Sequence, residues 1–334
     1  MYVKWLMCDR HACGFIRGEA LAREVNKRFA PKHRVDVTST VSLSDLYRTQ
    51  VVVFQRFHQP DIFAWLRDCA RNGARTVYDL DDDFFNVPEG YEPVLFYNKP
   101  KVRKVIEKFL QSVDLVTVST APLAREVAKH TERPVHVVGN ALELKAWSKP
   151  PRRSPREVVV GWMASGSHVL DAPLVQGALE RLLDAHPCVK VVTVGLVDQK
   201  VMPNLKRFKG RVDHLPWIPI HQLPHIMSTF DIGISPLQNN PFNDSKSGIK
   251  ALQYWASQSA VVVSRSPAYG LVEDGVDGFL VDTPDEWFER LDRLVKDSAL
   301  RESMGLEGRK KLVRQYDFRN CVLDWLSVFE RVLN

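Results

Sequence analysis

The chain has 334 residues, of which 45% are hydrophobic and 26% are charged, and its formal net charge at pH 7 is +6. This composition is typical of a soluble globular protein and excludes a disordered chain, while the length predicts two domains and therefore a cleft between them. Five scattered cysteines without a CxxC pair argue against a disulfide framework and against a structural zinc site. No apolar run approaches the ~20 residues that cross a bilayer, and the opening MYVKWLMCDR is charged too early for a signal peptide, so we expect a cytoplasmic protein.

The first half of the chain alternates short β-branched runs with amphipathic stretches. This alternation is typical of a parallel sheet with helices on both faces. The predicted strands are residues 3–8, 35–37, 51–54, 76–79, 115–118 and 135–138, and the predicted helices are residues 18–29, 61–72, 102–112 and 122–130. We therefore expect a complete doubly wound domain over residues 1–145.

A basic, proline-containing stretch, WSKPPRRSPR, predicts an extended linker over residues 146–156. A second α/β domain is expected over residues 157–316. Its predicted strands are residues 157–162, 189–195, 212–214, 231–235, 260–264 and 278–281, with helices beginning near Ala172, Ile220, Ser247 and Pro284. The last segment, residues 317–334, carries a helical apolar stripe that needs a partner surface.

Within the second domain, residues 230–263 predict a buried strand ending at Pro236, a polar loop, a helix that opens near Ser245, and a second apolar strand. Lys246 and Lys250 would lie one turn apart on that helix. A helix N-terminus with two ammonium groups on one face suits a phosphate, which favours a nucleotide or nucleotide-sugar site. The alternative is an ordinary βαβ unit whose lysines are solvated.

Five ordered segments resemble GT-B-fold glycosyltransferases of the family-4 type, glycosyl transferases group 1, and especially a short bacterial and phage branch. They are VGNALE at 138–143, the stretch 158–195, LPWIPIHQLPHIMSTFDIGISPL, KSGIKALQYWA and VEDGVDGFLV. YDLDDDFFNVP at 78–88 and VDLVTVST at 113–120 match more loosely. The resemblance implies two tandem Rossmann-like domains facing a cleft, with a UDP- or GDP-linked sugar donor in the second, an acceptor in the first, and a last helix that crosses back onto the first.

Two positions depart from the family's pattern. The resemblance places Gln253 where the family has a ribose-binding glutamate and Ser245 where it has a sugar-binding glutamate. Gln253 can still offer an amide to a ribose hydroxyl, whereas Ser245 is too short to serve a hexose. Lys246 and Lys250 could instead neutralise the departing diphosphate.

Small residues in two loops are also expected at the donor. GSH at 166–168 opens the first helix of the second domain, where a small-residue loop can approach a phosphate closely, although His168 could merely cap the helix. In the first domain, the resemblance puts Gly14 against the sugar phosphate, and Arg17 could reach a phosphate. The expected donor-binding residues are Gly14, Arg17, Ser165, Gly166, Ser167, His168, Pro236, Ser245, Lys246, Ser247, Gly248, Lys250 and Gln253.

The acidic string YDLDDD follows a predicted strand at the edge that faces the cleft. A carboxylate there could orient or deprotonate an acceptor hydroxyl, and the expected catalytic residues are Asp81, then Asp79, with Lys250 on the donor side. Carboxylates of this string could ligate a metal, or some could cap the following turn. Because the resemblance is to a fold that works without a metal, we expect neither a metal nor a cofactor, and the nucleotide-sugar is a co-substrate.

The leading hypothesis is thus a nucleotide-sugar-dependent glycosyltransferase, with retention implied by the resemblance. The acceptor is either a hydroxymethylated DNA base, flipped out of the duplex, or a glycan or lipid-linked sugar at an anionic membrane surface. The pI of about 9.0 and the absence of an amphipathic membrane helix favour DNA slightly. A different class is a non-catalytic nucleotide-sugar-binding homologue, since two signature carboxylates are absent. No obligate protein partner is evident.

Overall fold

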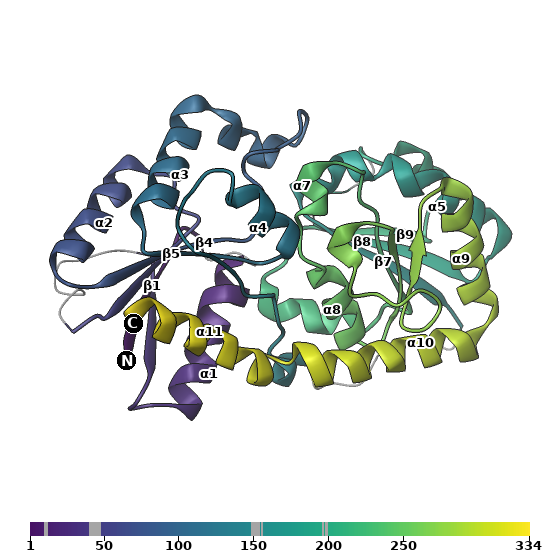
Figure 1. Cartoon of the computed structure of the whole chain (residues 1–334). Helices are drawn as coiled ribbons and strands as arrows, with labels where there is room; N and C mark the ends of the chain where they lie inside the picture. The colour runs from purple at the N-terminus through teal and green to yellow at the C-terminus, as the bar shows by residue number, and fades with distance from the viewer. Residues whose placement is uncertain (10–12, 40–47, 148–153, 155, 196, 198–199) are drawn as a thin grey trace.

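The computed structural model describes residues 1–9, 13–39, 48–147, 154, 156–195, 197 and 200–334, apart from the side chains of residues 93 and 167. It contains two six-stranded parallel sheets, each flanked by helices (Figure 1). Each predicted strand is present, and the α/β fold class is confirmed. Most of the predicted linker, at 148–153 and 155, lies outside the described residues.

The first sheet has the strand order β2-β1-β3-β4-β5-β6. Strands β1, β3, β4 and β5 are almost entirely buried because helices cover both faces, which explains their continuous apolar runs. The strands are β1 (Tyr2–Met7), β2 (Arg34–Thr38), β3 (Val51–Gln55), β4 (Arg75–Leu80), β5 (Leu115–Val118) and β6 (Val135–Val137). The helices are η1 (Gly14–Glu19), α1 (Ala20–Arg28), α2 (Pro60–Arg71), η3 (Glu92–Asn98), α3 (Pro100–Ser112) and α4 (Ala121–Val127).

The second sheet has the order β12-β11-β10-β7-β8-β9, so the winding reverses between β7 and β10. Its strands are β7 (Val158–Ala164), β8 (Val189–Gly195), β9 (Val212–Leu215), β10 (Ile232–Ser235), β11 (Ala260–Ser264) and β12 (Phe279–Val281). Its helical segments are η5 (Gly166–Asp171), α5 (Pro173–Ala185), η6 (Pro203–Arg207), η7 (Ile220–Gln222), α6 (Leu223–Met227), α7 (Pro241–Asp244), α8 (Ile249–Ala256), η8 (Pro267–Tyr269), α9 (Pro284–Lys296), α10 (Ser298–Lys311) and η9 (Leu312–Tyr316), preceded by η4 (Leu144–Trp147). Ligands of such sheets bind beyond the carboxyl ends of the strands at the point of reversal.

The helix predicted to open near Ser245 begins later than expected. The side chain of Asn240 caps the one-turn helix α7 by accepting from the backbone N–H of Asn243, and α8 starts only after Gly248. Lys246 therefore lies between two helices, and only Lys250 stands in the first turn of α8. The prediction that both lysines share one helical face was wrong because an Asn-Pro start signal inside the predicted loop begins a separate helix.

The last helix, α11 (Phe318–Leu333), crosses back to the first domain, as the long yellow segment in Figure 1 shows. Its apolar stripe packs into the same core as β1, with the ring of Trp325 edge-on to that of Trp5 at 5.0 Å between centroids. The partner surface that the stripe requires is thus the first sheet. Among the described helices, none combines the length and apolar character needed to cross a membrane.

The two domains are also joined through α7, which lies beside α4 in Figure 1. Phe242 of α7 is 1% exposed and belongs to the hydrophobic core of the first domain, with its ring 5.5 Å from that of Tyr91. Asn243 donates a hydrogen bond to the Tyr91 hydroxyl (3.1 Å), and Tyr91 donates to Asp171 (3.3 Å). This contact fixes one edge of the domain interface beside the cavity described next.

Candidate functional site

A cavity of about 1010 Å³ lies between the domains, at the carboxyl ends of the strands of both sheets. Its polar lining from the first domain consists of Asp9, Cys13, Glu19, Arg56, Asp81, Asp82 and Asn140. Its polar lining from the second domain includes Ser165, His168, Lys246, Ser247, Lys250 and Gln253. Both predicted donor loops and the acidic string therefore meet in one cavity.

The predicted site residues divide into two groups. Those that line the cavity are Asp81, Ser165, Gly166, His168, Lys246, Ser247, Lys250 and Gln253. Those that are not part of its lining are Gly14, Arg17, Asp79, Pro236, Ser245 and Gly248. The side chain of Ser167 lies outside the described residues.

Arg17 and Asp79 hold each other rather than a ligand. Nε of Arg17 donates to Oδ2 of Asp79 (2.8 Å), its second terminal nitrogen donates to Oδ1 (2.6 Å), and Thr117 also donates to Oδ1 (2.7 Å). Both side chains are buried, at 1% and 0% exposure. The expectations of a phosphate at Arg17 and of a catalytic Asp79 are therefore corrected, because a buried guanidinium and carboxylate neutralise each other away from the cavity.

Three of the other residues outside the lining support its shape. A Cβ on Gly14 would lie 2.3 Å from the carbonyl oxygen of Asp9, so only glycine fits there. A Cβ on Gly248 would lie 1.9 Å from the side chain of Leu271. Pro236 is buried directly after β10. These residues position the loops without facing the cavity.

Ser245 contacts the other domain instead of a sugar. Its carbonyl oxygen accepts a hydrogen bond from Thr120 (2.8 Å), and its hydroxyl lies 3.5 Å from a carboxylate oxygen of Asp83. Asp83 itself accepts from the backbone N–H groups of Phe85 and Asn86, so it caps the turn after the acidic string. The expectation that some aspartates of the acidic string cap the following turn is therefore met at Asp83.

Two lysines make the second domain's wall positive. Burial and then the charge of the neighbouring Lys246 ammonium lower the pKa of Lys250 to about 8. Burial also lowers the pKa of Lys246, against the charges of Asp171 and Asp82. A cation held in a partly dehydrated cavity gains strongly from an anionic ligand.

His168 stands beside the lysines as a neutral imidazole. Burial and then the charge of Lys246 lower its pKa to about 4. Its Nδ1 is 2.9 Å from a carboxylate oxygen of Asp171, and since an ionised carboxylate only accepts, Nδ1 carries the proton. Nε2 is then a hydrogen-bond acceptor.

Gln253 carries an unused acceptor at the cavity. Its side chain is 3% exposed, and its Oε1 is buried without a hydrogen-bond partner in the described structure. A buried carbonyl without a donor is costly, so a ligand that brings a hydroxyl would satisfy it. A smaller apolar hollow of about 160 Å³, lined in part by Phe15 and Trp147, also reaches Gln253.

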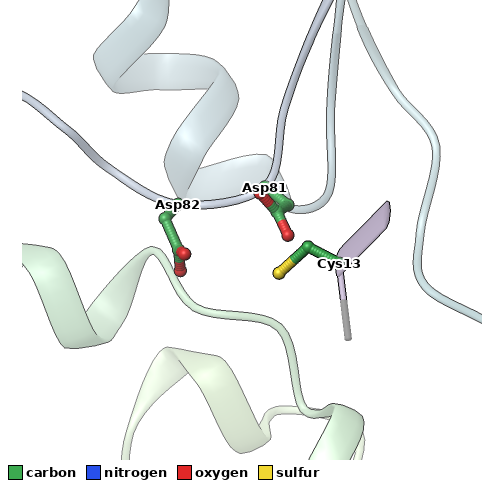
Figure 2. A group of neighbouring side chains, drawn as sticks. All are labelled: Cys13, Asp81 and Asp82. Carbon is green, nitrogen blue, oxygen red and sulfur yellow. The ribbon is translucent and has the colours of Figure 1, made fainter. Parts of the chain in front are cut away.

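The first domain's wall gathers Cys13, Asp81 and Asp82, whose ligand atoms lie within 4.8 Å of one another (Figure 2). The guanidinium of Arg56 is 3.5 Å from Asp81 and 3.6 Å from Asp82. Burial and then the charge of Asp81 raise the pKa of Asp82 to about 6. Burial raises the pKa of the Cys13 thiol well above its ordinary value, so it remains protonated. By ligand type this group could hold a divalent cation, but Arg56 already supplies positive charge.

Sequence reasoning missed Arg56 and Asn140. Arg56 directly follows β3, at the same strand edge that directed attention to the acidic string, and it adopts a left-handed φ of 59° that is uncommon outside glycine. Asn140 donates to Ser247 across the cleft (2.8 Å) and accepts from Arg17 (2.9 Å). The strand-end rule could have found Arg56, and Asn140 lies within VGNALE, one of the segments that carry the resemblance.

Comparison with known proteins places this cavity in a family context. The family model for glycosyl transferases group 1 matches residues 155–297. TuaH of Bacillus subtilis (strain 168), whose name provisionally assigns it as a glycosyltransferase of teichuronic acid biosynthesis, is 27% identical over 210 residues. That match covers 58% of this chain and 51% of TuaH, so the chain spans about half the length of this curated relative.

Solved structures show the same two-domain arrangement. Anabaena HepE, in complex with UDP and glucose, superposes with a TM-score of 0.68 at 13% identity, covering 98% of this chain and 99% of HepE. Sucrose-phosphate synthase of Thermosynechococcus elongatus gives 0.70 at 13% identity and 99% of each chain. TarM of S. aureus, a mutant in complex with fondaparinux, alpha-GlcNAc-glycerol and UDP, gives 0.64 at 15% identity, covering 84% of this chain and 55% of TarM.

Identities this low establish the fold alone, and the family match covers the domain that carries Lys246, Lys250 and Gln253. The chain therefore has the GT-B fold, and residues 155–297 of its second domain match the family model for glycosyl transferases group 1.

Proposed function

We propose that the protein transfers a sugar from a UDP- or GDP-linked donor to an acceptor hydroxyl in the cavity between its domains. The observation that carries the proposal is the pair of partly buried ammonium groups, Lys246 and Lys250, on the wall contributed by the family-matched domain. The UDP found in the HepE and TarM complexes supports a nucleoside diphosphate as the donor's carrier.

The chemistry requires positive charge where these lysines lie. Transfer breaks the bond between the anomeric carbon and a diphosphate oxygen, and the bonding electrons leave with the diphosphate. Ammonium groups held in place before the reaction stabilise this developing charge more than they stabilise the bound donor, which lowers the barrier. Lys250 and Lys246 bind the diphosphate, Oε1 of Gln253 accepts from a ribose hydroxyl, and Nε2 of His168 accepts from a hydroxyl of the transferred sugar.

The opposite wall receives the acceptor. Asp81 and Asp82 lie at the cavity, and the acceptor hydroxyl loses its proton as its oxygen bonds to the anomeric carbon. Asp82 suits the role of proton acceptor, because a base whose pKa lies near the working pH transfers protons efficiently. The proposal includes retention at the anomeric carbon, on the resemblance of the second domain. Retention in one step requires the acceptor oxygen to bond to the face of the sugar that the diphosphate leaves. The proposal also includes a reaction in which Arg56 takes the place of a metal ion.

Thermal-shift measurements with UDP, GDP and a panel of their sugar conjugates test the donor. A nucleotide that binds only the folded protein raises its melting temperature, by an amount that grows with its concentration relative to Kd. The Lys250→Ala and Lys246→Ala variants should lose this shift, whereas Lys296→Ala, whose side chain is 65% exposed on α9, should keep it.

Two outcomes separate the alternatives. Failure of every nucleotide to raise the melting temperature contradicts the proposal. Binding of a nucleotide-sugar without hydrolysis or transfer to any acceptor assigns the chain to the non-catalytic class instead. Unchanged transfer after addition of a strong chelator is the result expected for a reaction without a metal ion.

A further inference from the structure

The two walls of the cavity differ in charge. The second domain's wall carries the ammonium groups of Lys246 and Lys250. Among the described residues of the first domain's wall, the carboxylates are those of Asp9, Glu19, Asp81 and Asp82, and the one cationic side chain is that of Arg56. A ligand that spans the cavity therefore meets opposite potentials at its two ends.

The positive groups near the acidic wall are already shared. Arg56 lies between Asp81 and Asp82, at 3.5 and 3.6 Å, so one guanidinium serves two carboxylates. Glu19 has Arg23 at 3.6 Å, but Arg23 also forms a 2.9 Å ion pair with another carboxylate, that of Glu143. Lys246 of the opposite wall also lowers the pKa of Asp82, so the described cations offset part of the charge of this wall.

Within the described part of the chain, two polar atoms on this wall also lack hydrogen-bond partners. They are Oδ1 of Asp81, on a side chain that is 6% exposed, and Nε of Arg56, which lies 3.5 Å away. One is an acceptor and the other is a donor. Both atoms are buried and face each other, so a hydroxyl that donates to Asp81 and accepts from Arg56 reaches them when these two side chains move apart.

We infer that the group entering the first domain's wall is the uncharged, hydroxyl-rich end of a saccharide, and that this wall rejects acceptors whose reacting end carries a phosphate or a carboxylate. The inference rests on the proposed function and names its acceptor class. A neutral sugar satisfies the unpaired atoms of Asp81 and Arg56. An anionic group brings like charge within a few ångströms of Asp81 and Asp82 in a partly dehydrated cavity, where repulsion is strong.

The same argument opposes duplex DNA as the acceptor. A flipped base carries phosphates on both sides of its sugar, and these would approach the wall that holds Asp9, Asp81 and Asp82. Among the described residues, the Lys and Arg side chains that line the cavity are Arg56, Lys246 and Lys250, so the pI of about 9.0 that favoured DNA is not a property of the acceptor wall. The glycan alternative is thus the one that the charges of the cavity favour.

Ligand-detected NMR on the full chain, with a saturating concentration of the nucleotide that raises its melting temperature, tests the inference without requiring transfer. The probes are matched pairs: methyl β-glucoside against methyl β-glucuronide, methyl β-galactoside against methyl β-galacturonide, and N-acetylglucosamine against its 6-phosphate. We expect at least one neutral member to bind. Its anionic partner should have an affinity that is lower by a factor of about ten or more.

Charge-neutralising variants connect the preference to this wall. Asp82→Asn and Asp81→Asn should each narrow the difference between the members of a pair to about threefold or less, because a carboxylate that repels the anion is gone. If the variants at the buried positions do not fold, Glu19→Gln, at a partly exposed position, should narrow the same difference in affinity. Asp68→Asn, on the exposed surface of α2, is the matched control and should leave the preference intact.

The outcomes distinguish this inference from the proposed function. Equal or tighter binding of the anionic members overturns it, as does displacement of the neutral sugar by a duplex containing 5-hydroxymethylcytosine. The absence of binding by every saccharide in the panel, while the nucleotide still binds, also overturns it and leaves the donor assignment standing. If no nucleotide binds, it is the proposed function that fails.

Discussion

Arg17 and Asp79 form a two-pronged ion pair, with N···O distances of 2.8 and 2.6 Å, between side chains that are almost completely buried. The guanidinium also donates to the carbonyl oxygen of Val138 (2.9 Å) and lies 4.9 Å from the ring centroid of Trp325 on α11. The pair thus joins strand β4, the segment after β6 and the returning last helix, which is a structural task.

Removal of one partner should therefore destabilise the fold without removing a group that contacts a ligand. We expect Asp79→Asn to lower the free energy of unfolding by about 3–5 kcal/mol, because it leaves the Arg17 charge buried and unpaired. Urea denaturation measures this loss. The folded fraction should still show the nucleotide-induced thermal shift. A folded Asp79→Asn protein that does not bind the nucleotide would show that Asp79 belongs to the binding site.

The lowered pKa of Lys250 predicts how nucleotide affinity depends on pH. Its pKa of about 8 means that it is an ammonium below that pH and a neutral amine above it. Because only the charged form attracts a diphosphate, the affinity for UDP or GDP should fall as the pH rises through about 8. Calorimetric titrations between pH 7 and about 9.5, which is roughly one and a half units above the pKa of Lys250, would measure this change in affinity.

The matched variant for this measurement is Lys250→Met, which keeps the aliphatic chain. It should bind more weakly at neutral pH and lose most of the decline in affinity above pH 8, about where Lys250 titrates. A wild-type affinity that is flat across this range would show that the diphosphate binds elsewhere.

The raised pKa of Asp82 predicts how the transfer rate depends on pH on the acid side, a part of the profile that we call the acid limb. If it accepts the acceptor's proton, kcat/KM should rise with pH through about 6 and level off above it, and Asp82→Asn should lose both the rate and this limb. His168 adds no limb near neutrality, because its pKa of about 4 keeps it neutral there. A limb that survives in Asp82→Asn would assign the base to another group.

The raised pKa of Asp82 also makes the stability of the fold depend on pH. The pKa of Asp82 is raised in the folded state, so the folded chain binds more protons than the unfolded chain between about pH 4 and about pH 6, and stability falls as the pH rises through this window. Asp82→Asn should remove that fall and be more stable than the wild type at pH 7. Denaturation curves at pH 4, about 5.5 and 7 check the sign.

The sequence predicted the sheets well because parallel strands buried on both faces are continuous apolar runs, such as the VVVF of β3 and the AVVV of β11. Helix starts were less certain. The Asn240–Pro241 pair lay inside a stretch interpreted as a loop, so α7 was missed, and with it the entry of Phe242 into the core of the other domain.

Within the site, the strand-end position pointed to Asp81, helix starts pointed to His168, Lys246 and Lys250, and the family resemblance pointed to Gln253; all five line the cavity. These signals could not distinguish Asp79 from Asp81. Residues two apart on a strand point to the same face, and what separates these two is a partner, Arg17, that lies 62 residues away in the chain. A contact of that range has no local signature.

Cys13 offers a direct measurement of the potential at the acidic wall. It lines the cavity beside Asp81 and Asp82 (Figure 2). A cationic methanethiosulfonate reagent should modify it about tenfold faster than an anionic reagent of similar size, whereas the exposed Cys188 should discriminate less. Peptide mass spectrometry separates the two sites, and the ratio at Cys13 should fall in Asp82→Asn. Faster modification by the anionic reagent would contradict the charge assigned to this wall.

Phe242 predicts that the two domains unfold as one unit. A residue of the second domain that fills the core of the first couples their stabilities, so Phe242→Ala should cost about 3–5 kcal/mol and also loosen the closed arrangement around the cavity. Small-angle scattering should then report a larger radius of gyration, and the nucleotide-induced thermal shift should shrink. Phe208→Ala is the matched control, because that ring is buried wholly within the second domain's own core. It should destabilise the chain without enlarging it, and equal expansion in both variants would mean that Phe242 has no special part in holding the domains together.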